Sequence, residues 1–253
     1  MNYKQFEDNI FAEWRKRSVA NGDGCELASD GLLYRGRFVY KDGYWSREPG
    51  NENAIWERAK RRVLILTKDL NDEEAWDIRA ETGRNNFSGE NNVVVSAPFY
   101  KNLMRWVYGL LTIDANGHAK KFAEIDRQDV YRPFYDQVPV ARVNCKKQVG
   151  KSSIETSVLK SYMERYKDLL VKQISAYDAN ILLCCGASGA IKDFVAENYL
   201  TDLLKLNNWV YYSPRTRKMV IDSWHPTYTG DTHEKMYSDM MSGVEEAWSR
   251  IKL

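Results

Sequence analysis

The sequence predicts an α/β protein in which helices cover both faces of a parallel sheet. Two observations predict it. Four short runs after residue 62 are apolar throughout, which is typical of strands buried on both faces. Stretches with helical spacing of apolar residues separate these runs, and strands that alternate with helices form parallel sheets. The expected strands are 63–67, 138–143, 180–185 and 219–222, and the expected helices are 101–111, 155–177, 189–206 and 233–251.

The 253 residues are enough for one large domain. We expect that domain over residues 61–253, with residues 1–60 as an extension packed on it. Residues 3–18 carry large apolar side chains on one face of a helix. The Lys-Asp-Gly segment at 41–43, between two aromatic runs, predicts a β-hairpin.

Charge is nearly balanced but unevenly placed. The net charge is +2, which does not fit an obligate nucleic-acid coat protein. Residues 142–172 hold eight basic and three acidic residues, whereas residues 72–90 hold two basic and six acidic ones. Two interpretations stay open: one edge of the protein faces phosphate, or the basic stretch is a solvated helix face.

The four cysteines form no C-x-x-C motif and no cluster with histidine. The sequence therefore predicts no disulfide framework and no zinc or iron–sulfur site. The N-terminus has no apolar signal core, and no segment approaches the roughly 20 apolar residues of a membrane span. We expect a monomer in the cytoplasm.

Polar residues follow three of the four expected strands. Ligands of such sheets bind beyond the carboxyl ends of the strands. Asp69 follows the first strand, where a carboxylate can activate water or balance a developing cation. Asn144 follows the second, and its amide can read the edge of a planar heterocycle. His225 follows the fourth, and the proline after it helps to aim the ring.

Each of these residues also has a purely structural explanation. An aspartate after a strand is often a helix cap or a turn former. A lone histidine more often packs than catalyses, and His118 and His233 receive no role. The Gly-Ala-Ser-Gly segment at 186–189 is interpreted as a tight turn into a helix. The convergence of Asp69, Asn144 and His225 on one sheet edge is what favours a site.

The strand-end segments, taken in order, resemble the motifs of the uracil-DNA glycosylase superfamily. In that superfamily a G-Q-D-P-Y or G-E-A-P-G motif follows the first strand, an aromatic residue stacks on the base, an asparagine closes a strand, and an H-P-S motif comes last. The resemblance covers about residues 62–250. The matching segments are LTKDLN at 66–71, APFYKN at 97–102, VARVNCKK at 140–147, ILLCCG at 181–186 and HPTY at 225–228.

The resemblance implies a three-layer α/β/α sandwich with a four-stranded, mainly parallel sheet. It also implies an enzyme that hydrolyses the N-glycosidic bond of a flipped-out base such as uracil in DNA, without metal or cofactor. Asp69 would orient water and His225 would donate to the base; both are the catalytic candidates. Base-binding candidates are Asn144, Phe99, Lys68 and Asn71. Candidates for phosphate or DNA contacts are Ser152, Ser153, Lys146, Lys147, Thr227 and Tyr228, with Lys151, Arg215 and Arg217 as further contributors at the mouth of the site.

The sequence departs from the family at Leu70-Asn71, which replaces the Pro-Tyr or Pro-Gly pair that shapes the pocket of relatives. The base removed, and the choice between single- and double-stranded DNA, therefore stay open. So do two other functions on the same scaffold: an N-glycosidic hydrolase acting on nucleotides or RNA, and a non-catalytic nucleic-acid-binding module.

Overall fold

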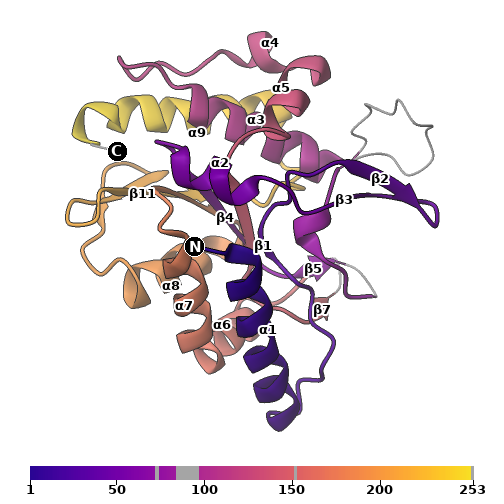
Figure 1. Cartoon of the computed structure of the whole chain (residues 1–253). Coiled ribbons are helices and arrows are strands. Elements are labelled where there is room, and N and C mark those ends of the chain that lie inside the picture. Colours follow the sequence, from indigo (N-terminus) through magenta and orange to yellow (C-terminus); the bar gives the residue numbers. More distant parts are fainter. Residues whose placement is uncertain (72–73, 84–96, 151–152, 252–253) are drawn as a thin grey trace.

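A mixed seven-stranded sheet forms the centre of the protein (Figure 1). The structure, a computed structural model, describes residues 1–71, 74–83, 97–150 and 153–251. The strand order is β1-β6-β4-β8-β11-β10-β9. The bounds are β1 (Gly31–Leu32), β6 (Val140–Asn144), β4 (Val63–Thr67), β8 (Ile181–Cys185), β11 (Lys218–Ser223), β10 (Val210–Ser213) and β9 (Leu204–Lys205).

The four strands expected from the sequence are the parallel neighbours in the middle of this sheet. The expectation of a four-stranded sheet is nevertheless wrong in number, because β1, β10 and β9 extend it with antiparallel pairings. Two of these added strands are only two residues long, so they carry no readable pattern. The protein is therefore α/β with a mixed sheet.

Helices cover both faces of the sheet (Figure 1). Along β4, Leu64 and Leu66 face one hydrophobic cluster, whereas Val63 and Ile65 face the other. This alternation is the period of two that a strand buried on both sides must have. The first cluster packs under α1 (Tyr3–Ala20), α6 (Thr156–Arg165), α7 (Lys167–Tyr177) and α8 (Ala190–Asn198), and the second under α3 (Pro98–Thr112), α5 (Gln128–Tyr135) and α9 (His233–Ala247).

The expected helices differ in detail from those observed. The stretch 155–177 forms two helices, because Tyr166 has a non-helical backbone and caps both. The stretch 189–206 stops being helical at Asn198, and its end supplies β9. Two short helices complete the fold, α2 (Glu52–Arg58) and α4 (Phe122–Ile125), together with the 3-10 turns η1 (Ile78–Ala80), η2 (Ala187–Gly189) and η3 (Trp248–Arg250).

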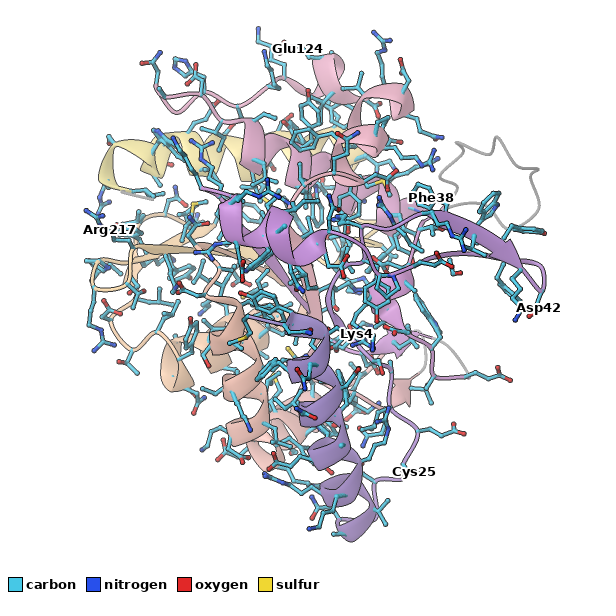
Figure 2. The ribbon with its side chains drawn as sticks, viewed as in Figure 1. Lys4, Cys25, Phe38, Asp42, Glu124 and Arg217 are labelled. Atoms are coloured by element: carbon cyan, nitrogen blue, oxygen red, sulfur yellow. The ribbon has the colours of Figure 1, made fainter. Side chains whose placement is uncertain are left out.

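Residues 1–60 share the core of the protein. The apolar face of α1 buries Ile10, Phe11 and Trp14 in the first cluster, and β1 pairs with β6. The helix predicted over residues 3–18 is confirmed. The predicted hairpin is also confirmed, as β2 (Phe38–Lys41) and β3 (Tyr44–Arg47). It projects from the body of the protein, and Figure 2 shows Asp42 at its outer end.

A small parallel ladder ties together the loops that follow β4 and β6. It joins β5 (Leu70–Asn71) to β7 (Val149–Gly150). The backbone N–H of Lys146 also donates to the carbonyl of Lys68, at 2.7 Å. The two loops are thereby held side by side at the carboxyl edge of the sheet. Over the part of the chain described, no helix has the length and apolar character needed to cross a membrane.

Candidate functional site

The carboxyl ends of the four parallel strands lie in one row. Thr67 pairs with Asn144, and Cys185 pairs with Ser223. Leu66 pairs with Cys184, so Thr67 and Cys185 continue the same row. By the alternation along each strand, these side chains point to the face covered by α3 and α9. That row forms the floor of the candidate site.

Asp69 lies just beyond the end of β4, and its carboxylate is enclosed. The side chain is only 2% exposed. Gly150 in β7 lies against it so closely that a Cβ at position 150 would sit 1.9 Å from Oδ2. Burial raises the pKa of Asp69, while the positive charges of Lys146 and Lys68 lower it. Oδ2 is 3.6 Å from Lys146 Nζ, and Oδ1 has no hydrogen-bond partner among the residues described.

Asn144 closes β6 and is fully buried. Its backbone N–H donates to Asp30 Oδ2 at 2.8 Å, which fixes the end of the strand. Its side-chain Oδ1 accepts a hydrogen bond from the Thr67 hydroxyl at 2.5 Å. Within the described ranges, its Nδ2 has no acceptor. Buried polar groups are nearly always paired, so a free donor at the row of strand ends is informative.

His225 follows β11 in a loop that α3 holds in place. Asn102 on α3 donates through Nδ2 to the carbonyl of Pro226 at 2.6 Å. The backbone N–H of Thr227 donates to His225 Nδ1 at 3.3 Å, and the Thr227 hydroxyl lies 2.8 Å from the same nitrogen. With Nδ1 as an acceptor, the ring proton resides on Nε2. Burial, together with the charges of Lys68 and Arg142, lowers the pKa of His225 to about 4, so the ring is neutral at pH 7.

Two neighbours determine where the His225 ring lies. Phe99, in the first turn of α3, has its ring centroid 5.9 Å from that of His225. Gly186 directly follows β8 with a φ of 80°, and a Cβ there would lie 2.9 Å from the Cβ of His225. Only glycine lets the chain come so close in this backbone conformation. The turn expected at 186–189 is present, and all four of its residues have positive φ.

Arg142 supports Phe99 from within the sheet. Its guanidinium carbon lies 4.5 Å from the centroid of the Phe99 ring, a cation–π arrangement. The same guanidinium pairs with the buried carboxylate of Glu81. Burial raises the pKa of Glu81, and the charge of Arg142 opposes that rise. The Phe99 ring beside His225 is therefore in contact with a buried ion pair.

The prediction that Lys147 contacts phosphate is wrong. Its side chain is 0% exposed, and its ammonium donates to both oxygens of Asp30 and to Gln173 Oε1, at 2.7–2.9 Å. Lys146 is only partly exposed, and its ammonium donates to the carbonyls of Gln148 and Val149. It borders a surface pocket of about 450 Å³ beside α6.

Arg215 and Arg217 do not lie near this site either. Both precede β11, in its turn with β10, whereas His225 follows β11; they therefore belong to the opposite edge of the sheet. Figure 2 shows Arg217 far from the projecting hairpin, on the other side of the molecule. The sequence order already implies this position, because both arginines precede the strand expected over 219–222 whereas His225 follows it.

The remaining candidates lie as follows. Lys68 is partly buried beside Asp69, and its positive charge lowers the pKa of both Asp69 and His225. Thr227 and Tyr228 are exposed beyond His225, with the Tyr228 ring stacked on Trp224. Ser153 is exposed ahead of α6. Asn71 belongs to β5, and its side chain lies outside the described part, as do Lys151 and Ser152.

Sequence reasoning missed three residues of this edge: Thr67, Arg142 and Ser223. Thr67 gives no separate signal in the sequence, because it is the last residue of an otherwise apolar run. Arg142 had a signal, a charged residue within a strand that is otherwise buried on both faces. Ser223 is buried two residues before His225, and its hydroxyl has no partner in the ranges that the structure describes.

No protein-family model and no curated protein matches this sequence. Across the described residues, no group of three or more histidine, cysteine, aspartate or glutamate side chains is arranged to hold a metal ion. The case for a function therefore rests on the geometry of the site itself.

Proposed function

We propose that this protein hydrolyses the N-glycosidic bond of a base flipped out of DNA, a deaminated base such as uracil. The observation that carries the proposal is His225. It is a neutral imidazole whose Nδ1 accepts from Thr227, so its Nε2–H is a donor, and its ring lies beside Phe99. Asn144 and Asp69 follow neighbouring strands at the same edge of the sheet.

The reaction assigns a role to each of these groups. When the bond between C1′ and the base breaks, its electron pair stays on the base and positive charge develops on the sugar. His225 Nε2–H donates to the base oxygen that gains charge; one such donor is worth about 3–4 kcal/mol in the transition state. Asp69 stabilises the cationic sugar and orients the water that adds to C1′, and that water's proton leaves to solvent. Flipping the base out of the stack costs a few kcal/mol.

Recognition of the base falls to Phe99 and Asn144. The Phe99 ring offers an apolar face on which a planar base can stack, and such stacking is worth about 1–3 kcal/mol. The Asn144 Nδ2 donor has no partner within the described chain, so a base acceptor there would satisfy it. The side chains of Thr227 and Tyr228 are exposed next to His225 and supply contacts to the sugar–phosphate backbone of the DNA.

A second candidate is the same hydrolysis on a nucleotide or on RNA. It is favoured by the burial of Lys147 and the internal bonds of Lys146, which leave fewer cations for the phosphates of a duplex than the sequence suggested. A free nucleotide or a short strand needs fewer such contacts than double-stranded DNA.

The test is release of base from oligonucleotides that contain a single uracil, in single- and double-stranded form, and from uridine nucleotides and RNA. Wild type should release uracil, and His225→Ala should be slower by about 100- to 1000-fold. His118→Ala is the matched control, because His118 is an exposed loop histidine. If wild type releases no base from any of these substrates or from other deaminated DNA, the protein is not a glycosylase, and binding without hydrolysis would indicate a nucleic-acid-binding module.

A further inference from the structure

The ammonium of Lys146 is held inward by the loop that follows β6. It donates to the carbonyl of Gln148 at 3.0 Å and to that of Val149 at 2.9 Å, and the side chain is only 17% exposed. The backbone N–H of Lys146 donates to the carbonyl of Lys68 at 2.7 Å, which ties the start of this loop to the residue before Asp69. Hydrogen bonds thus fix both ends of the residue, and the fold sets the position of its charge.

The charge held in this way faces one oxygen of Asp69. Lys146 Nζ lies 3.6 Å from Asp69 Oδ2, which is longer than a hydrogen bond, so the contact is electrostatic. Gly150, from the same loop, packs directly on that oxygen, because a Cβ at position 150 would lie 1.9 Å from it. Asp69 Oδ1 has no hydrogen-bond partner in the described part of the chain. One oxygen of the carboxylate therefore contacts the loop after β6, and the other forms no bond within the described fold.

We infer that Lys146 is a positioning residue for Asp69: its ammonium, fixed by two backbone carbonyls, holds Oδ2 against the loop after β6 and leaves Oδ1 as the oxygen that meets the sugar and the water. This inference rests on the proposed function. It assigns Lys146 a role other than the phosphate contact expected from the sequence, because the ammonium already has two carbonyls and a carboxylate as neighbours.

The same contact affects the charge of Asp69. Burial raises the pKa of Asp69, and the positive charges of Lys146 and Lys68 lower it. Asp69 stabilises a cationic sugar only when it is ionised, so removal of the Lys146 charge increases the fraction of protein in which the carboxyl is neutral and inactive. Lys146 also lowers the pKa of Asp23, on the side of the surface pocket, but Asp23 is paired with Arg165.

The experiment measures single-turnover release of uracil from an oligonucleotide as a function of pH. Lys146→Met removes the charge, so the acid limb of the profile should move to higher pH. The rate on that limb should fall about tenfold, since an opposite charge within about 4–6 Å typically shifts a carboxyl pKa by a unit or more. A purely structural role would lower the rate equally at every pH.

Two further variants show whether the charge is responsible. Lys146→Arg keeps the charge, and the pocket of about 450 Å³ that Lys146 borders gives the larger side chain room. It should restore the acid limb of the wild type. Lys160→Met is the matched control, because it removes the charge of an exposed lysine of α6. If Lys146→Met fails to fold, Lys146→Gln provides a second reading, since it keeps an N–H donor for the carbonyls but lacks the charge; it too must move the limb to higher pH.

The titration of Asp69 itself separates this inference from the proposed function. Its carboxyl carbon signal, assigned by its loss in Asp69→Asn, is followed by NMR as the pH changes. Lys146→Met should raise the pKa of Asp69 whether or not the protein releases base. If that pKa stays at its wild-type value, the role of Lys146 is wrong, and release of uracil by wild type still supports the hydrolase. If the pKa rises but wild type releases no base, the contact with Asp69 stands and the hydrolase proposal is wrong.

DNA binding tests the rival role of Lys146. A lysine that contacts a phosphate contributes about one unit to the slope of log K against log salt. We expect Lys146→Met to keep the wild-type slope, because the ammonium is already bound to the carbonyls of Gln148 and Val149. A smaller slope together with an unchanged acid limb would assign Lys146 to phosphate and overturn the inference.

Discussion

Asp30, just before β1, and Asp69, just beyond β4, are both buried aspartates beside the central sheet, but their carboxylates differ in how they are paired. Asp30 accepts four hydrogen bonds: two from Lys147 Nζ, one from Gln173 Nε2 and one from the backbone N–H of Asn144. Asp69 Oδ1 has no partner among the described residues, and Oδ2 only faces Lys146 at 3.6 Å. The carboxylate of Asp30 is thus paired within the fold, whereas in the described part of the chain the carboxylate of Asp69 keeps an oxygen free for a ligand.

The comparison extends to the neighbours of each carboxylate. Around Asp30, the ammonium of Lys147 has three acceptors within 2.9 Å. At the row of strand ends, Asn144 Nδ2 and Ser223 Oγ both lack partners in the described chain. Because an unpaired buried polar group costs stability, a fold tolerates several of them close together mainly where a ligand completes them. The strand ends are therefore a part of the protein whose unpaired polar atoms the proposed substrate would complete.

The largest effect that would sharpen this comparison is on stability. Asp30→Asn should lower the free energy of unfolding by about 3–5 kcal/mol, because it leaves the charge of Lys147 buried and uncompensated. Asp69→Asn should leave the protein at least as stable as wild type at pH 7, since it removes a carboxylate whose charged form is disfavoured by burial. Urea unfolding of both variants provides the measurement.

The pH dependence of the free energy of unfolding checks the predicted direction of the Asp69→Asn effect. The raised pKa of Asp69 means that the folded wild type binds a proton more readily than the unfolded chain. Wild type should therefore gain stability relative to Asp69→Asn as the pH falls toward the ordinary carboxylate range. Equal losses of stability in the Asp30 and Asp69 variants at pH 7 would contradict the claim that only Asp30 stabilises the fold.

The next effect is on rate. Asp69→Asn should slow base release by about 100- to 1000-fold, which is roughly 3–4 kcal/mol of transition-state stabilisation. Substrate affinity should change much less, because the sugar carries positive charge mainly in the transition state. Single-turnover kinetics separate the two quantities. A variant that binds poorly but reacts at the wild-type rate would place Asp69 in substrate binding instead.

A smaller effect is expected from Gly150→Ala. The added Cβ would lie 1.9 Å from Asp69 Oδ2, so either β7 or the carboxylate must move. We expect a loss of about 1–3 kcal/mol in the free energy of unfolding, as for other overpacked sites, together with slower base release. Gly43→Ala tests whether loss of a glycine alone is responsible, because its added Cβ meets no atom within 4 Å, and its positive φ, which Gly150 lacks, makes it the more demanding position for alanine. Similar activity loss in both variants would contradict the role of the close contact.

The smallest effect concerns the titration of His225. Lys68→Met should raise the pKa of His225 from about 4 toward its usual value, and only in part, because burial, the largest cause, remains. The ring signals of the three histidines can be followed by NMR as the pH is lowered. Because unfolded His225 takes up its proton near pH 6.5, the contribution of His225 to the stability of the fold should fall as the pH drops from there toward pH 4. A pKa of His225 near 6.5 in the wild type would refute the neutral, half-buried imidazole.

The sequence predicts the centre of this fold better than its edges. Continuous apolar runs reveal the four parallel strands, and the strand-end rule places Asp69, Asn144 and His225 at one edge. Lys147 could not be placed, because its partner Asp30 lies 117 residues away in the sequence. A lysine beside a strand gives no sign of whether its ammonium reaches solvent or a distant carboxylate. The free end of the Asn144 amide likewise depends on a partner on another strand.

The pairing of β1 with β6 has a consequence for how the chain is made. Asp30 meets Lys147 across 117 residues, and Glu7 meets the hydroxyl of Tyr177 across 170. At a synthesis rate of about 5–20 residues per second, Glu7 in the first helix waits roughly 9–34 s before Tyr177 is synthesised. During that time its apolar face, with Phe11 and Trp14, lacks the residues of α6 and α7 that pack on it in the folded protein. Completion of the core around α1 is therefore a late event.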